Sequence, residues 1–107
     1  MMSKYYLNED KTYRQAELME WAEQIEEMSK KGTKHVGNDM ILGKHVSTVW
    51  LGLDHNLYGG EPHVFETMIF SEHVPRTDIY MDRYSTWDEA VAGHQKAIEW
   101  VKKHYGT

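Results

Sequence analysis

Two stretches of the chain repeat apolar residues at steps of three and four, the spacing of one face of an α-helix. The first has its apolar positions at Leu18, Trp21, Ile25 and Met28. Its start, Thr12-x-x-Gln15, has the form of a capping box, and Gly32 follows its basic end. We therefore predict a first helix over about residues 12–31.

The second helical pattern lies near the end of the sequence. Thr86-Trp-Asp-Glu89 is another capping box, with acidic side chains in the first turn. The apolar face behind it is made of Trp87, Val91, His94, Ile98, Val101 and Tyr105. Two lysines suit the negative end of the helix dipole, and Gly106 follows them, so this pattern predicts the last helix.

The middle of the chain changes to a period of two, which is typical of half-buried β-strands. Between His45 and Leu53 the apolar residues alternate, and β-branched residues are frequent. Three further strands are expected over residues 33–41, 63–70 and 79–84. Because the connections are short, they predict an antiparallel four-stranded meander rather than parallel strands with crossovers.

The predicted order of elements is α-β-β-β-β-α, an α+β fold. The most economical arrangement packs both amphipathic helices on one face of the sheet. A chain of 107 residues is long enough to bury one core. We therefore predict a single domain over residues 1–107, in which residues 1–11 form a loose polar tail.

Charge and composition narrow the possible partners. The chain has 12 Lys+Arg against 17 Asp+Glu, a net charge of −5 with neutral histidines. Double-stranded RNA-binding domains have a similar order with one strand fewer, but an acidic chain does not attract phosphates, which argues against nucleic acid. The absence of Cys excludes disulfides and thiolate chemistry. With neither a signal peptide nor an apolar run of membrane-spanning length, we expect a cytoplasmic protein without a membrane partner.

Candidate chemistry gathers where the second predicted strand ends and the third begins. Asp54 and His55 follow one strand, and His63 and Glu66 open the next, across a loop that contains two glycines. A hairpin would bring the first three of these residues to one end of the sheet. Glu66 falls on an otherwise apolar strand face, and His94 interrupts the apolar face of the last helix, so both need a partner or a function.

These residues admit two interpretations. In the functional one, Asp54, His55, His63 and Glu66 hold a zinc- or iron-type metal, or a small hydrolase uses imidazole and carboxylate groups as acid and base. In the structural one, Asp54 caps a turn, His55 and Glu66 face water, and His94 bonds a backbone carbonyl in the core. No known metal-motif spacing occurs, and for His94 the structural interpretation is the stronger.

Aromatic and acidic residues point instead to binding. Trp50 alternates away from the apolar odd positions, so it is expected on the sheet face that the helices do not cover. This face either favours self-association or a partner, or is covered by the loop over residues 71–78 and the N-terminal tail. Alternatively, Trp50 or Tyr58 can stack on a small nucleotide, with the N–H groups of Gly59-Gly60 at its phosphate and Arg76 and Arg83 gathered in a dimer cleft. The glutamates of the first helix form a solvated face or an acidic docking surface for a basic protein.

Three blocks of the sequence stand out together: Val46–His55 (VSTVWLGLDH), Phe65–Phe70 (FETMIF) and Arg83–His94 (RYSTWDEAVAGH). In this order they resemble a family of small proteins encoded in bacteriophage and prophage genomes. The resemblance spans roughly half of the chain. It implies an accessory protein in the cytoplasm of a host cell, one that acts on host defences by binding a protein or a nucleotide signal, and it carries over no catalytic residue.

The leading hypothesis is a homo-oligomeric binding protein without catalysis or cofactor, whose partner is a host protein or a small nucleotide. Its candidate binding residues are Trp50, Asp54, His55, Tyr58, Glu66 and His94. The alternative is a small metal-binding protein or hydrolase that uses Asp54, His55, Glu66 and His94.

Overall fold

The structure is a computed structural model that describes residues 2–71 and 78–106. Within that range the elements are β1 (Tyr5–Leu7), β2 (Tyr13–Gln15), α1 (Leu18–Lys31), β3 (His35–Ile41), β4 (Lys44–Trp50), β5 (Phe65–Ser71), β6 (Asp78–Tyr84) and α2 (Trp87–Tyr105). Residues 72–77, in the connection between the strands predicted over residues 63–70 and 79–84, lie outside the described residues. Across the described parts of the chain, no helix combines the length and apolar character that crossing a membrane requires.

The four strands β3, β4, β5 and β6 form one antiparallel sheet, in which each strand pairs with the next along the chain. This confirms the predicted meander and the α+β class. The two-residue turn Leu42-Gly43 joins β3 to β4, and both residues have positive φ angles, 51° and 76°. Such a turn matches the natural twist of paired strands, so it fixes the register of this hairpin.

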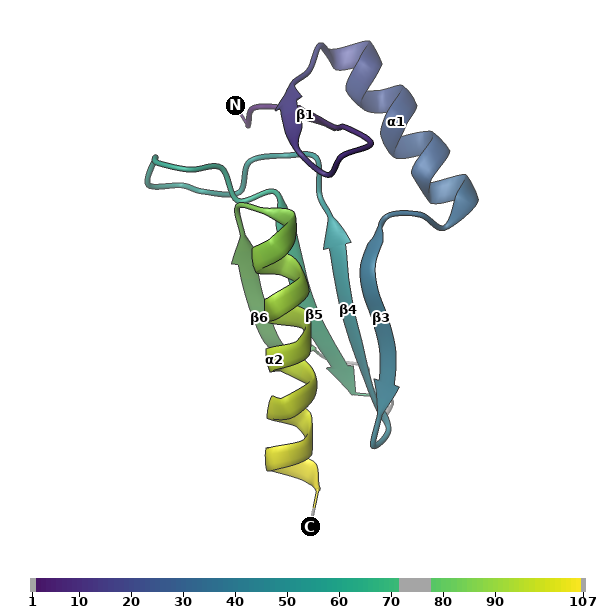
Figure 1. Ribbon diagram of the computed structural model, residues 1–107, viewed down its shortest axis with the longest axis vertical. Helices are drawn as coiled ribbons and strands as arrows, with labels where there is room; N and C mark the ends of the chain where they lie inside the picture. Colours follow the sequence, from purple (N-terminus) through teal and green to yellow (C-terminus); the bar gives the residue numbers. More distant parts are fainter. Residues whose placement is uncertain (1, 72–77, 107) are drawn as a thin grey trace.

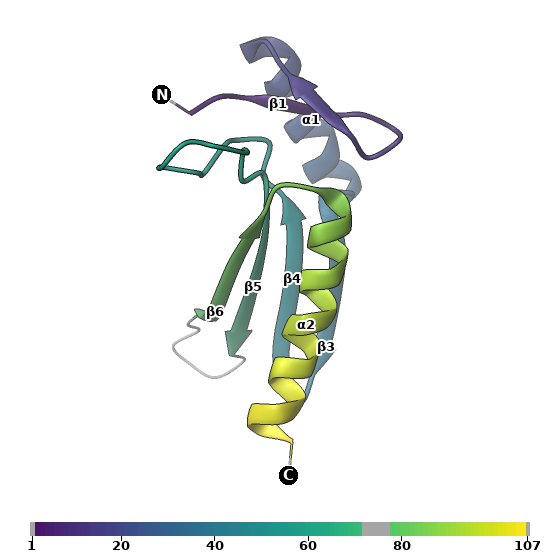
Figure 2. The same ribbon diagram turned by 60° about the vertical axis from the view of Figure 1, so that its left-hand side comes forward.

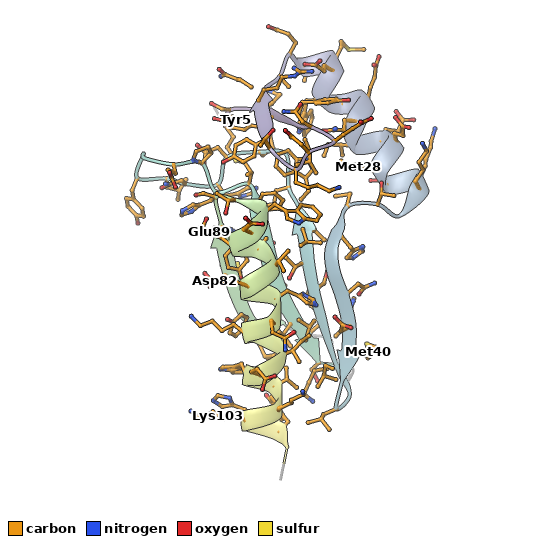
Figure 3. The ribbon with its side chains drawn as sticks, in the orientation of Figure 1. Tyr5, Met28, Met40, Asp82, Glu89 and Lys103 are labelled. Carbon is orange, nitrogen blue, oxygen red and sulfur yellow. The ribbon has the colours of Figure 1, made fainter. Side chains whose placement is uncertain are left out.

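Helix α2 lies across one face of the sheet and contacts all four strands (Figure 1). Its predicted capping box is present, because the Thr86 hydroxyl accepts from the Glu89 N–H while the Glu89 carboxylate accepts from the Thr86 N–H. Figure 3 shows Glu89 at this end of the helix. The buried face of α2 consists of Ala90, Gly93, His94, Ala97, Ile98 and Val101. Val91 and Tyr105, expected on that face, are exposed because the helix turns its small residues toward the sheet.

The core lies between α2 and the even-numbered residues of β4, which are buried, whereas the odd-numbered ones are half-buried. Trp50 is therefore fully buried and not on a free sheet face, which corrects the prediction from the sequence. Its indole lies 5.1 Å from the Phe65 ring and 5.6 Å from the Tyr13 ring, measured between centroids. The predicted alternation is correct, but α2 covers the face that carries Trp50. The N-terminal residues Tyr5 and Leu7 pack in the same core cluster as Trp50, in agreement with the alternative that the N-terminal segment covers this face.

The N-terminal segment is an ordered hairpin rather than a loose tail. β1 pairs antiparallel with β2, and the Tyr5 N–H donates to the Gly52 carbonyl at 2.9 Å. Thr12 caps no helix, because its N–H and its hydroxyl both donate to the Asp10 carboxylate within the hairpin turn. The first helix therefore begins at Leu18, six residues later than predicted, since strand pairing occupies the backbone groups of Tyr13–Gln15.

Helix α1 packs against β1 of this hairpin and lies beyond the adjoining end of the sheet (Figures 1 and 2). The Gln24 side-chain amide bonds both the N–H and the carbonyl of Leu7, at 2.9 and 2.8 Å. Figure 3 labels Tyr5 and Met28, which both pack against the part of the core that contains Trp50 and Phe65. The predicted packing on one sheet face holds directly for α2, whereas α1 packs on the hairpin and joins the same core at the end of the sheet through Ile25 and Met28.

Candidate functional site

Asp54, His55 and His63 meet just beyond the paired ends of β4 and β5. The His55 N–H donates to the His63 carbonyl at 3.0 Å, which continues the antiparallel pairing past the two strands. Asp54 Oδ1 accepts from the N–H groups of Asn56, at 2.8 Å, and of His63, at 3.0 Å. Asp54 thus closes the base of the following loop, in agreement with the structural interpretation of this residue.

The loop above this base is held in one shape by Asn56. Its Nδ2 donates to the carbonyls of Gly59 (2.6 Å) and Glu61 (2.8 Å). Its Oδ1 accepts from the Tyr58 N–H at 3.0 Å. A single amide side chain therefore connects three points of the loop, so the backbone on both sides of Tyr58 is fixed without help from another element.

The same loop carries the most exposed apolar side chains on the described surface, Leu57 at 85% and Tyr58 at 96%. It projects from the body on the side away from α1 (Figures 1 and 2). Gly59 and Gly60 follow with φ angles of 81° and 90°, which glycine adopts without strain. We call Leu57 and Tyr58 the loop tip. Tyr58 was a candidate from the sequence, whereas Leu57 was not.

Glu66 lies on the sheet face opposite α2 and has a partner there. The Arg83 Nε donates to Glu66 Oε2 at 2.9 Å, between residues that are directly opposite in the β5–β6 register. The Glu66 side chain is only 13% exposed and that of Arg83 only 32%. Because a half-buried carboxylate requires such a cation, the pair is part of the sheet, and Arg83 is not presented to a phosphate.

His94 joins the buried hydroxyl groups of Thr48, Thr67 and Tyr84 to the exposed carboxylate of Asp39. His94 Nε2 lies 2.6 Å from Asp39 Oδ2, and His94 Nδ1 lies 2.7 Å from Thr48 Oγ1. Thr48 Oγ1 also hydrogen-bonds Thr67 Oγ1, to which the Tyr84 hydroxyl donates at 3.1 Å. The partners of the imidazole are thus two side chains, not the backbone carbonyl that the sequence interpretation expected.

The order carboxylate–imidazole–hydroxyl is the order of groups in serine hydrolases. Here the hydroxyl belongs to Thr48, whose exposed fraction is 0%. A substrate carbonyl cannot reach an oxygen that is closed in between the sheet and α2 and already bonded to Thr67. The network therefore links α2 to the sheet and offers no accessible nucleophile.

Tyr84 and Gly37 lie next to the hydrogen-bonded side chains of this network. Burial raises the pKa of the Tyr84 phenol to about 12, against a smaller opposing effect of its hydrogen bond to Thr67. Gly37 lies under the His94 ring, where a Cβ would come within 2.6 Å of it. The space for the imidazole thus depends on a glycine in β3, a relationship that no pattern along the sequence indicates.

The metal interpretation finds no support among the residues that the structure describes, since no three His, Asp or Glu side chains gather closely enough to hold an ion. Asp54 is bonded to two backbone N–H groups, and Glu66 to Arg83. His55 and His63 are near each other through their backbones, but they are not joined there by a third ligand. The four candidate ligands are therefore not brought together as a site.

The positions of the candidate stacking and phosphate-binding residues also weaken the nucleotide hypothesis. Trp50 is fully buried and cannot stack on a base, and Arg83 is paired with Glu66. Arg76 lies outside the described residues. Tyr58 remains exposed, but it stands on a projecting loop and not in a cleft.

A shallow hollow of about 620 Å³ lies between α1, the β1–β2 hairpin and the start of α2. Acidic residues in its wall include Glu20, Glu23 and Glu27. Two of these are already neutralised, Glu20 by Arg14 at 2.6 Å and Glu27 by Lys31 at 2.6 Å. The predicted acidic docking surface on α1 is therefore largely a set of ion pairs.

The comparisons with known proteins leave the family open. No family model matches the chain, and searches of curated proteins and of solved structures gave no significant match.

Proposed function

We propose that this chain is a phage-type accessory protein that acts in the host cytoplasm by binding a host protein, without catalysis. The observation that carries the proposal is the loop tip, where Leu57 and Tyr58 are 85% and 96% exposed. The two side chains are adjacent, so together they expose more apolar area at one point than a single surface residue does, which supports an interaction site there.

The polar candidate residues support the same function because their side chains already have partners within the fold. Asp54 closes a loop, Glu66 pairs with Arg83, and His94 bonds Asp39 and Thr48. Each of these groups is engaged with the fold, so the apolar side chains, not the acid–base groups, are left to meet another molecule. A host protein fits them better than a nucleotide signal does, because no aromatic cleft accompanies the exposed tyrosine.

The experiment is native mass spectrometry of the tagged full chain, isolated at low expression from a bacterial host. We expect a complex of fixed stoichiometry with one host protein, whose formation does not require turnover of any small molecule. The charge-reversed variant Glu99→Lys, on the exposed side of α2, serves as a control for non-specific electrostatic capture. A chain that stays free of host protein in every preparation would contradict the proposal.

A further inference from the structure

The sheet face opposite α2, which we call the outer face, has no covering layer among the described elements. Strands β3 to β6 contact one another and α2, and α1 contacts only β1. Figures 1 and 2 show α2 along one side of the sheet and α1 beyond its end. Within the part of the chain that the structure describes, the sheet is therefore covered on one side only.

Apolar side chains lie on the outer face at positions where a solvated sheet face is usually polar. Met68 of β5 pairs with Met81 of β6, and Met40 and Val49 belong to the same face on β3 and β4. Met40 and Met81 are 57% and 51% exposed. An antiparallel sheet with one face in water normally alternates apolar and polar residues. The departure from this alternation favours burial of the outer face against another molecule.

The charges on the outer face cancel within one chain. Arg83 Nε donates to Glu66 Oε2, and no other described side chain of the four strands adds a full charge to this face at neutral pH. The net charge of −5 is therefore carried elsewhere on the chain. A basic or acidic partner finds no opposite net charge here. Two copies of the chain, by contrast, can bring their outer faces together without the like-charge repulsion that acts between their other surfaces.

The area of the outer face is that of a weak dimer interface. Four strands of seven residues each, about 4.8 Å apart and with a rise of about 3.4 Å per residue, span roughly 450 Å² in projection. Side chains make the accessible surface larger than this projection, so stacking two outer faces buries roughly 1,000–1,200 Å² in total. This is the lower limit of specific interfaces, and it corresponds to a reversible dimer with a dissociation constant in the micromolar range.

We infer that the outer face is the interface between two copies of this chain, stacked sheet to sheet about a two-fold axis. Ser47 and Met68, which are paired at the centre of the sheet, lie nearest the axis. Flexible methionine side chains fill the space between two facing sheets without needing one fixed shape. The proposed function does not use this surface, so either proposal can fail without the other.

The first test is sedimentation equilibrium of the purified full chain from about 1 μM to 1 mM, where a dimer of this size dissociates. Met68→Lys should raise the dissociation constant at least about tenfold, because it places two ammonium groups opposite each other. Met81→Lys, at a more exposed position, should raise it as well. Val91→Lys, at a position that is 48% exposed on α2, is the matched control and should leave it unchanged. Thermal melting shows that each variant is folded.

Two further measurements locate the contact. Mixing Met68→Lys with Met68→Glu should restore dimers that contain one chain of each kind, as native mass spectrometry would show. The chain has no Cys, so the Ser47→Cys variant carries a single thiol. This thiol should react with a bulky maleimide more slowly at concentrations where the dimer forms, whereas Ser29→Cys, at an exposed position of α1, should react at one rate throughout.

The contrary outcomes are distinct. A wild-type chain that stays monomeric at the highest concentration overturns the inference. Dimers that persist in Met68→Lys and Met81→Lys but dissociate in the Leu57→Ser/Tyr58→Ser variant would move the contact to the loop tip and overturn it as well. Should one lysine variant fail to fold, the other variant and the thiol reaction rates decide. None of these results contradicts binding of a host protein through the loop tip.

Discussion

The imidazole of His94 on α2 and the carboxylate of Asp39 on β3 lie 2.6 Å apart, although 55 positions separate them in the chain. The other ring nitrogen of His94 reaches Thr48 on β4. One side chain on the helix thus bonds to two adjacent strands. Since a buried hydroxyl without a partner is costly, the fold depends on this connection.

Replacing His94 by Phe should lower the free energy of unfolding by about 2–3 kcal/mol, because the ring volume stays while the buried Thr48 hydroxyl loses a partner. Urea unfolding followed by circular dichroism measures the change. His35→Phe, at an exposed position of β3, is the matched control and should change stability by less than about 0.5 kcal/mol. Adding Thr48→Val to His94→Phe should cost less than Thr48→Val does in the wild type; equal costs would show that the two side chains are not coupled.

We predict one direction for the hydrogens of this network. Tyr84 donates to Thr67, so the Thr67 hydroxyl is free to donate to Thr48, and Thr48 in turn to His94 Nδ1. The hydrogen of the imidazole should then reside on Nε2, facing Asp39. Nitrogen-15 NMR of labelled His94 at neutral pH distinguishes the two ring nitrogens. A hydrogen found on Nδ1 would refute this order.

Gly93 in α2 makes room for the Tyr84 ring, since a Cβ at position 93 would lie 2.2 Å from ring atoms. Gly93→Ala should therefore destabilise the protein by about 1–3 kcal/mol, even though alanine favours a helix. Ser29→Ala, at an exposed position of α1, should by contrast leave stability equal or slightly raised. Thermal melting compares the two variants, and a stabilised Gly93→Ala chain would be incompatible with this close approach.

Leu42 occupies the first position of the β3–β4 turn with a φ angle of 51°. Side chains other than those of Gly, Asn and Asp adopt this region at a cost, and Asn-Gly is the preferred sequence of such turns. Leu42→Asn should raise the free energy of unfolding by about 1 kcal/mol in urea titrations. Leu57→Asn makes the same chemical change at another exposed leucine, outside the positive-φ positions, and should give no such gain. Equal effects at both sites would rule out turn strain as the cause.

The buried phenol of Tyr84 makes stability fall at alkaline pH. Burial raises its pKa from 10.0 to about 12. The unfolded chain therefore releases this proton at lower pH than the folded one, so the contribution is complete below pH 10 and is lost as the pH rises toward 12. Its full size is roughly 3 kcal/mol.

This alkaline loss is measured by urea midpoints at pH 8, 10 and 11.5. Tyr84→Phe should flatten the decline between pH 10 and 12. Tyr58→Phe, which removes a tyrosine from the exposed loop tip, should leave the decline as steep as in the wild type. An undiminished decline in Tyr84→Phe would assign the effect to other groups, among which Tyr13 and Tyr80 also have a pKa raised by burial.

Local sequence was enough to predict the parts of this fold that depend on neighbouring residues. The alternation of β4 and the capping box at Thr86 follow from dihedral preferences and nearby hydrogen bonds, and both occur. The same reasoning failed at Thr12. A capping box and a strand compete there for the same backbone groups, and pairing with β1 decides the competition.

What surrounds each side chain was decided only by the tertiary structure. Periodicity separates the two faces of β4, but it cannot say which face α2 covers, so Trp50 was assigned to the wrong one. The partners of His94, Asp39 and Thr48, lie far from it in sequence and meet it only when helix and sheet pack. The glycine-rich loop could be expected from residues 55–62, whereas its rigid shape arises from the bonds of Asn56. Secondary structure follows from steric preferences and hydrogen bonds between residues close in sequence. The burial of a side chain and its contacts depend on packing between residues far apart in sequence, which local patterns do not reveal.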